Sequence, residues 1–429
     1  MKITAFGIIW LCTFFVYLAK RRKWGMISLT LLTMIFQSNN FLIIGNTGIG
    51  VQICAVLFLI LVLIINNKGY ERTYNQYQGR GKRVHILKIF IFLIMASILI
   101  SLAGNGVALS EAFIPVMMIF VYVLLAWILL SKRVNVTREE IEKLEDKLVI
   151  IIAIVGFLQI LCKLGLPLLK ELLTILVYND TTNTNVIFHT KPLAVFYSTF
   201  MEPSYCGAML VGLFALFAMR EKKKKNMFLT ILLMIIIVLT RSSTAYAGLA
   251  IVLAIMFLTS KEKKIYHLIL PIVLMGVAFM LIFYSDVLNT VLFEKNLSAS
   301  YRVRMRWNTA AGEAFLTSPL IGVGYGNLRA SSLIYCILGE QGIIGLSSYA
   351  MFILYFVRKI FSKFTDGFIK SHAWLVLGVS VGQALACPDL NFSPFWLSLY
   401  LYILAFYSIE NSKGEELYEN RDSNISSGA

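Results

Sequence analysis

The chain has 429 residues, of which 58% are apolar and only 14% are charged, and its mean hydropathy is +0.77. This composition excludes a soluble globular protein, in which about a quarter of the residues are charged, and it indicates a polytopic membrane protein. The net charge of +16 does not imply a nucleic-acid partner, because basic residues collect in the cytoplasmic loops of membrane proteins and attract anionic lipids.

Apolar runs recur along the whole chain. A run of about 17–25 apolar residues crosses a bilayer core, and this length predicts about 13 transmembrane segments, within a range of about 12–14. Because lipid offers no water to unpaired backbone groups, each span is expected to be a helix, which makes the fold an all-α polytopic integral membrane protein. The segments lie near 3–19, 24–44, 49–66, 85–103, 113–130, 148–162, 205–219, 227–240, 245–259, 265–284, 336–357, 372–388 and 395–408.

Basic residues alternate between the loops. Since cytoplasmic loops collect Lys and Arg, the N-terminus is predicted outside and the C-terminus inside, with one membrane domain over 1–410 and a disordered cytoplasmic tail over 411–429. Arg220, in the inner run REKKKK, is then expected to affect little beyond insertion. Most of the 39 basic residues lie in the loops 20–23, 67–83, 131–147, 220–225, 261–264 and 358–370 and in the tail.

The outer side holds two long loops, 163–204 and 285–335, and a tight turn at 241–244. Leucines at helical spacing after Pro167 predict a helix in the membrane interface. Basic residues are few on this side, yet five are arginines, whose planar fork suits phosphate oxygens. If the segment is helical, Arg302 and Arg306 share a face; an extended segment would align Arg304 with them. The five are Arg241, Arg302, Arg304, Arg306 and Arg329.

Small and polar residues near these arginines are further candidates. Ser242, Ser243 and Thr244 can cap a helix that begins near residue 245, and capping alone explains them; the helix N-terminus also offers N–H donors to an anion. The glycines of GVGYGN (322–327) follow no strand of a βαβ unit, so they predict a tight turn or a close approach of the backbone to substrate. The scattered cysteines predict neither a zinc site nor disulfides. Among the four histidines, only His189, in an outer loop, is a candidate for a catalytic or metal-bound imidazole.

Two long motifs carry a family resemblance. LLMIIIVLTRSSTAYAGLAIVLAIMF and YRVRMRWNTAAGEAFLTSPLIGVGYGNL, with LGEQGIIGL after it, resemble signatures of the O-antigen polymerase and ligase family, and MEPS (201–204) is similar to a motif of its polymerase branch. The resemblance covers roughly residues 195–360.

This resemblance implies a membrane enzyme related to the type C glycosyltransferases. Such enzymes act on glycans attached to undecaprenyl diphosphate outside the bacterial cytoplasmic membrane, without a metal or a nucleotide sugar. The implied product is an O-antigen, capsule or exopolysaccharide. The expected partners are the lipid-linked oligosaccharide, membrane lipids, and a chain-length regulator and a flippase of the same pathway.

Resemblance and chemistry together assign roles. The departing lipid diphosphate gains negative charge in the transition state, which fixed cations stabilise. Arg241 matches the family's turn arginine, Arg302 or Arg306 matches the arginine before the glycine motif, and these are the expected catalytic residues. Glu202 is the expected base, chosen from outer carboxylates that include Glu313, Glu340 and Asp389. The expected substrate-binding residues are Arg304, Arg329, Ser242, Ser243, Tyr246, Gly324, Gly326, Asn327 and Glu340.

Three other functions stay open. The ligase branch usually carries His-Asn about nine residues before the glutamate of the final motif, and Ser331 and Ser332 stand there, which favours a repeat-unit polymerase over a ligase. A transporter that flips the lipid-linked sugar predicts ionisable residues or broken helices deep in the spans, and the spans are nearly free of charge away from their ends. A structural scaffold would leave the outer arginines unexplained.

Overall fold

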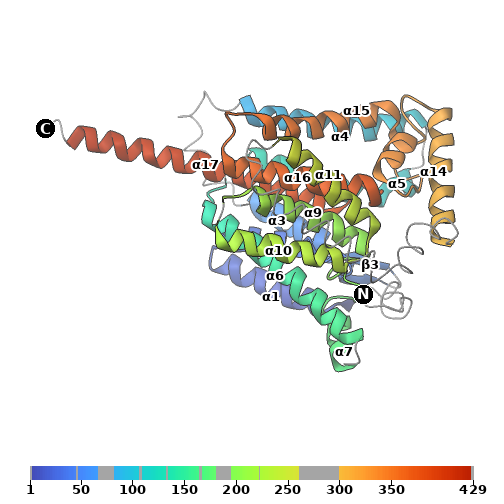
Figure 1. The fold of residues 1–429 in the computed structure, drawn as a ribbon, viewed down its shortest axis with the longest axis horizontal. Helices are drawn as coiled ribbons and strands as arrows, with labels where there is room; N and C mark the ends of the chain where they lie inside the picture. Colours follow the sequence, from blue (N-terminus) through green and yellow to red (C-terminus); the bar gives the residue numbers. More distant parts are fainter. Residues whose placement is uncertain are drawn as a thin grey trace.

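The structure, a computed structural model, describes residues 2–44, 47–65, 82–105, 109–131, 134–163, 167–179, 195–221, 223–259 and 299–426. These residues form fourteen helices and one small sheet (Figure 1). The first seven helices are α1 (Ala5–Ala19), α2 (Lys23–Thr33), α3 (Val51–Ile65), α4 (Lys82–Asn105), α5 (Leu109–Ser131), α6 (Arg138–Lys163) and α7 (Pro167–Leu176). The others are α9 (Pro203–Met219), α10 (Lys224–Leu239), α11 (Ser243–Thr259), α14 (Ala299–Thr317), α15 (Leu333–Phe361), α16 (Gly367–Ala386) and α17 (Ser393–Ser426). The expected span 265–284 and the candidate His189 lie outside the described residues.

Helices α9 and α16 lie side by side in the middle of the molecule, with most of their side chains buried (Figure 1). They pack through small residues. A Cβ atom added to Gly378 would lie 2.8 Å from the Cα of Gly212, and one added to Gly382 would lie 2.5 Å from the Cα of Ala208. Small residues of this kind let helix backbones approach closely, which is the usual way for helices to pack inside a membrane.

Helices at the periphery of the bundle carry the surface expected to face lipid. Three described helices are long and apolar enough to cross a membrane: Ile86–Gly104, Ala112–Ser131 and Leu333–Phe361. They expose large apolar side chains such as Phe92, Ile114 and Leu354. Five further apolar helices are shorter. The chain is therefore a mostly helical membrane protein, while the number of 13 spans stays a prediction.

The all-α expectation is wrong for residues 40–50. Helix α2 ends at Thr33, and the expected span 24–44 gives way to the strands β2 (Asn40–Ile44) and β3 (Thr47–Gly50). These pair antiparallel, and β1 (Lys2–Ile3) adds to the other edge of β2. Hydrogen bonds tie the start of β2 to the end of α7 and the segment after it: Asn39 donates to Leu176 O at 2.7 Å, and the backbone N–H of Asn40 donates to Asn179 Oδ1 at 2.5 Å.

Loops that the basic-residue pattern assigns to one side meet at one end of the molecule. At the end we call inner, Arg138 pairs with Glu221 at 2.9 Å, and Lys225 pairs with Asp146. At the end we call outer, segments near 35, 115, 196–200, 239 and 391 are joined. Their bonds are Thr199 Oγ1 to Ile35 O at 2.7 Å, Phe196 N to Leu239 O at 3.1 Å and Asn391 Nδ2 to Pro115 O at 3.2 Å. The end that faces the cytoplasm stays a prediction.

Three elements at the edge of the fold bear on the sequence predictions. The predicted helix after Pro167 is confirmed as α7, which protrudes with Leu168, Leu172 and Ile175 exposed (Figure 1). The segment around the three close arginines is helical, as α14. Helix α17 runs out of the bundle to Ser426, where the sequence analysis expects a disordered tail; a helix already nucleated in the bundle extends at low cost.

Arg220 has a larger role than its place in a basic run indicates. It is buried and pairs with the buried Glu145 of α6, whose other oxygen lies 2.7 Å from Nε2 of His372 in α16. The guanidinium also lies 5.2 Å and 5.3 Å from the rings of Phe217 and Phe368. The expectation that Arg220 affects little beyond insertion is therefore wrong. The sequence did not reveal this role, because Glu145 and His372 lie far from Arg220 along the chain.

We predict that Arg220→Ala destabilises the protein by about 3–5 kcal/mol, because removing one partner leaves Glu145 buried without its guanidinium. The measurement is the melting temperature of the purified protein in detergent. Lys225→Ala, which removes an ion pair whose lysine is 52% exposed, is the control and should change the melting temperature little. Equal melting temperatures for the two variants would contradict the prediction.

Candidate functional site

Three helices meet just below the outer end and bring their terminal residues together. A Cβ on Gly207 of α9 would lie 2.4 Å from the Cβ of Ala245 in α11, and Gly382 of α16 lies against both Ala208 and Gly248. Helices α9 and α11 both begin at the outer end, whereas α16 ends there. Glu202 lies just before α9, Arg241 just before α11 and Asp389 just after α16. The close packing of these helices therefore places the three residues around one region.

The turn between α10 and α11 holds Arg241 in an unusual backbone conformation. Its φ is 50°, in the left-handed region that costs non-glycine residues roughly 1–2 kcal/mol. Ser242 Oγ accepts the Ala245 N–H at 3.3 Å, so the predicted cap is confirmed, and the Tyr246 hydroxyl donates to Val238 O at 2.7 Å. Ser243 begins the helix. These contacts fix the turn, and strain of this kind clusters at functional sites.

Glu202 and Asp389 are both exposed at the outer end. Glu202 precedes α9 and accepts a bond from Ser204 Oγ at 3.2 Å. Asp389 accepts the Asn391 N–H at 2.8 Å, and its own carbonyl accepts from Gln383. Although Asp389 as a residue is exposed, neighbouring protein reduces the hydration of its carboxyl, and this desolvation raises its pKa above the usual aspartic range.

Glu202, Asp389 and Glu340 lie close enough to influence common neighbours or one another electrostatically. Tyr205, in the first turn of α9, lies within electrostatic range of Glu202, Asp389 and Arg329, and Asp389 also acts on Glu340. The structure thus brings together three of the four outer carboxylates. The fourth, Glu313, is exposed on α14.

Helix α15 breaks at the glycine loop. Gly342 has φ 64° and ψ −158°, which no helix contains. The loop of residues 318–328 fills the break: Val323 and Gly324 donate to the carbonyls of Gly339 and Glu340 at 2.9 and 3.0 Å. Within this loop Gly322, Gly324 and Gly326 all have positive φ. The predicted tight turn is present, and the loop backbone closely approaches α15, whereas its approach to a substrate stays a prediction.

Glu340 sits within the break and binds the loop. It is only 3% exposed, and its Oε1 accepts the backbone N–H of Gly326 at 3.0 Å and of Leu328 at 3.4 Å. Asn327 also contacts the loop, through a bond from Nδ2 to Val323 O. In this state Glu340 orders the glycine loop rather than facing an open surface, and substrate binding by Glu340, Gly324, Gly326 and Asn327 stays a prediction.

The arginines of α14 do not all point the same way. Ala311 and Asn308, which contact the rest of the fold, mark the inward face of the helix. At 100° per residue, Arg304 falls on that face and is half-buried, whereas Arg302 and Arg306 share the opposite, exposed face. The sequence prediction that Arg302 and Arg306 lie on one face of a helix is confirmed, while the inward position of Arg304 was not predicted.

Ion pairing differs between the two ends. Every ion pair within the described ranges involves residues of 138–225 or His372, at the inner end. In that same part of the chain, Arg302, Arg304, Arg306 and Arg329 form no ion pair. These four arginines therefore keep donors available for an anionic ligand.

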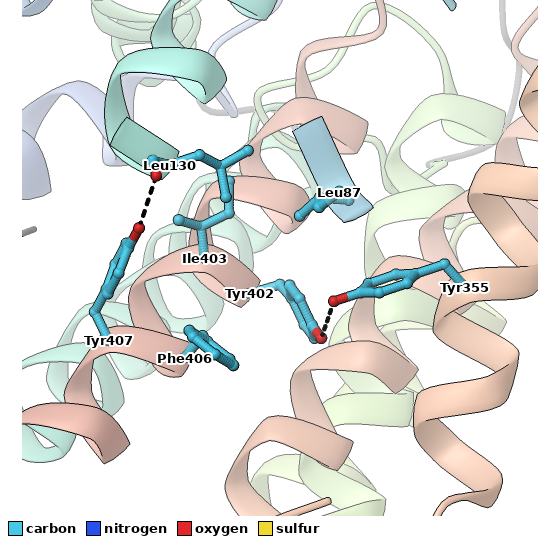
Figure 2. A pocket seen from close by; sticks show the side chains of 7 residues that line it. All are labelled: Leu87, Leu130, Tyr355, Tyr402, Ile403, Phe406 and Tyr407. Carbon is cyan, nitrogen blue, oxygen red and sulfur yellow. Dashed lines mark hydrogen bonds between the residues drawn. The ribbon is translucent and has the colours of Figure 1, made fainter. Parts of the chain in front are cut away.

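A small cavity lies elsewhere, between α4, α5, α15 and α17 (Figure 2). Its lining is apolar apart from three tyrosines, of which Tyr355 and Tyr402 bond to each other at 3.2 Å. Leu87 of α4 lines it, whereas Ser101 of the same helix donates to Glu340 O. The two residues are fourteen positions apart on one helix, which places the cavity about 20 Å from the glycine loop, so it is no part of the candidate site.

Comparison with known proteins supports the family resemblance. Residues 227–344 match the family model of the O-antigen ligases, which confirms the resemblance to the O-antigen polymerase and ligase family. The matched segment contains the Arg241 turn, α14 and the glycine loop, but neither Glu202 nor Asp389. No curated protein matches the chain. Members of this family are membrane enzymes that transfer glycans.

We predict that Gly322→Ala disrupts the site. Its φ is +67°, and a Cβ there would lie 2.2 Å from the backbone carbon of Glu340, so the loop must leave the break in α15. A cost of at least about 1–2 kcal/mol for the left-handed conformation alone should appear as a lower melting temperature. Gly312→Ala is the control, because nothing lies within 4 Å of that Cβ; it should be neutral or stabilising. Equal stability of the two variants would refute this account.

Proposed function

We propose that this chain, whose residues 227–344 match the O-antigen ligase family, is a polysaccharide repeat-unit polymerase. It transfers a glycan from undecaprenyl diphosphate to the next lipid-linked repeat unit at the outer face of the bacterial cytoplasmic membrane. The observation that carries the proposal is that the packed helices α9, α11 and α16 bring the residues at their outer ends, Glu202, Arg241 and Asp389, to one end of the molecule. Such an arrangement suits a reaction that needs cations for a leaving group and a base for a nucleophile.

The proposed step is a displacement at the anomeric carbon. A hydroxyl oxygen of the acceptor sugar bonds to that carbon, the bond from the carbon to the diphosphate oxygen breaks, and the lipid diphosphate leaves with the electron pair. Arg241 and the arginines of α14 stabilise the growing negative charge, aided by the N-terminal dipole of α11. No metal or nucleotide sugar is required for this balance.

The hydroxyl proton passes to a carboxylate. Glu202 is the base expected from the sequence, and Asp389 is a second candidate, because its raised pKa makes it a stronger base than an ordinary aspartate. Both lie in electrostatic range of Tyr205. Sequence reasoning counted Asp389 among the outer carboxylates without choosing it, because its proximity to α9 depends on contacts made by α16.

Two alternatives keep support. A ligase, which transfers the glycan to a different acceptor, is as compatible with the family match as a polymerase. A flippase for the same lipid-linked sugar predicts a broken helix within a span, and α15 has one at Gly342. The polymerase is preferred because Ser331 and Ser332 stand where the ligase branch usually carries His-Asn.

A single reconstitution separates the three functions. The purified protein in liposomes is incubated with the lipid-linked repeat unit of its host, and the products are resolved on a gel. A ladder of repeat lengths is the expected result for a polymerase. Transfer of one glycan to a different lipid acceptor would instead establish a ligase, and unchanged substrate that has crossed the bilayer would establish a flippase.

We also predict that Arg241→Gly lowers the rate of polymer formation about a hundredfold or more, since removing one donor to a developing anion costs about 2.7–4 kcal/mol. Glycine accepts the left-handed turn, so the backbone is kept. Arg241→Lys should restore little, because an ammonium lacks the bidentate fork.

The matched control is Arg21→Gly, since Arg21 also has a left-handed φ, 53°, in the turn between α1 and α2. Polymer length and amount are measured by gel at equal protein level, and the control should match the wild type. Wild-type polymer from the Arg241→Gly variant would show that this arginine has no role in the reaction.

A further inference from the structure

We infer that Trp307 is a positioning residue that holds Arg329 as a ligand for the diphosphate of the lipid-linked substrate. The inference rests on the proposed function, since it names a residue that prepares the same site. Trp307 lies on α14, Arg329 lies on the segment between the glycine loop and α15, and the guanidinium of Arg329 lies over the Trp307 ring.

The stacking geometry is specific. The guanidinium carbon of Arg329 lies 4.4 Å from the centroid of the Trp307 ring. An arginine stacked in this way keeps its N–H donors in the plane of the guanidinium, where they suit the oxygens of a phosphate. Arg329 is exposed and forms no ion pair with any described residue, so those donors remain open to a ligand.

The backbone on both sides of Arg329 is anchored. Leu328 N donates to Glu340 Oε1 at 3.4 Å, and both the N–H and the hydroxyl of Ser331 donate to Asn308 Oδ1 at 2.9 Å. Asn308 follows Trp307 directly on α14, so one helix turn fixes both members of the pair. A side chain fixed before binding loses less entropy when it engages its ligand.

Arg329 faces the candidate site. In the glycine loop just before it, the hydroxyl of Tyr325 accepts a bond from Asn391 Nδ2 at 3.1 Å, and the N–H of Asn391 donates to Asp389 Oδ1 at 2.8 Å. Trp307 lies next to the inward face of α14, beside Arg304, and away from the exposed Arg302 and Arg306. A diphosphate bound by Arg329 would therefore lie between α14 and the carboxylates, within reach of the proposed base.

The test is binding of farnesyl diphosphate, a short prenyl diphosphate, to the purified full chain in detergent. A stacked cation contributes about 0.5–1 kcal/mol at an exposed site and about 2 kcal/mol or more when desolvated, so Trp307→Leu should raise the Kd about three- to thirtyfold. Trp307→Phe, which keeps an aromatic face, should lie close to the wild type. Arg329→Lys should resemble Trp307→Leu, and the double variant should be no weaker than the worse single variant, because both changes remove one contact.

The control is Trp127→Leu, which removes a similar pair at the inner end, where Lys88 lies 5.3 Å from the ring; its Kd should equal that of the wild type. If Trp307→Leu fails to fold, the Arg329→Lys change is measured in the Trp307→Phe protein, where it should weaken binding as it does in the wild type. Wild-type Kd for Trp307→Leu, or additive losses in the double variant, would overturn the inference. Diphosphate binding that depends on Trp307 in a protein that forms no glycan product would leave the inference standing and reject the proposed function.

Discussion

The close packing of α9, α11 and α16 is the constraint on which the outer end of the molecule depends. Gly207 and Ala208 on α9 accept Ala245 and Gly382 at distances that no larger side chains would permit. Because α9 and α11 start at the outer end and α16 finishes there, this contact decides where the residues at those three ends lie. Small residues let helix backbones approach closely in membranes, so backbone packing places the charged groups at these helix ends.

A second constraint acts at the break in α15. Backbone groups at membrane depth must be satisfied within the protein, and irregular backbone is tolerated there only where protein buries it. The glycine loop meets this requirement, since its N–H groups bond to the carbonyls of Gly339 and Glu340, while Ile343 and Ile344 donate to Pro319 O and Leu320 O. The break is thus closed by the chain's own backbone. Its consequence is to hold the segment that carries Arg329 against α14.

Local patterns predicted much of this structure, and contacts distant in sequence account for what they missed. The Ser242 cap, the helix after Pro167 and the common face of Arg302 and Arg306 all depend on residues within one or two turns, which a sequence displays directly. The strands near residue 40 were hidden because their apolar residues continue the hydropathy of α2. The sequence did not reveal the buried ion pair of Arg220 or favour Asp389 as the base, because their neighbours lie on other helices. The Trp307–Arg329 pair was not predicted for the same reason.

The separation of charge at the outer end is itself a functional argument. At the inner end cations and carboxylates pair, as Arg220 and Glu145 do. At the outer end Arg329 and Asp389 act on the same tyrosine, Tyr205, which packs 5.6 Å from Phe392, yet no ion pair joins them among the described residues. A carboxylate that paired with a guanidinium would have a lowered pKa and be a weaker base, and the guanidinium would lose donors for phosphate. Holding the two apart preserves both, which a transfer reaction with an anionic leaving group and a hydroxyl nucleophile requires.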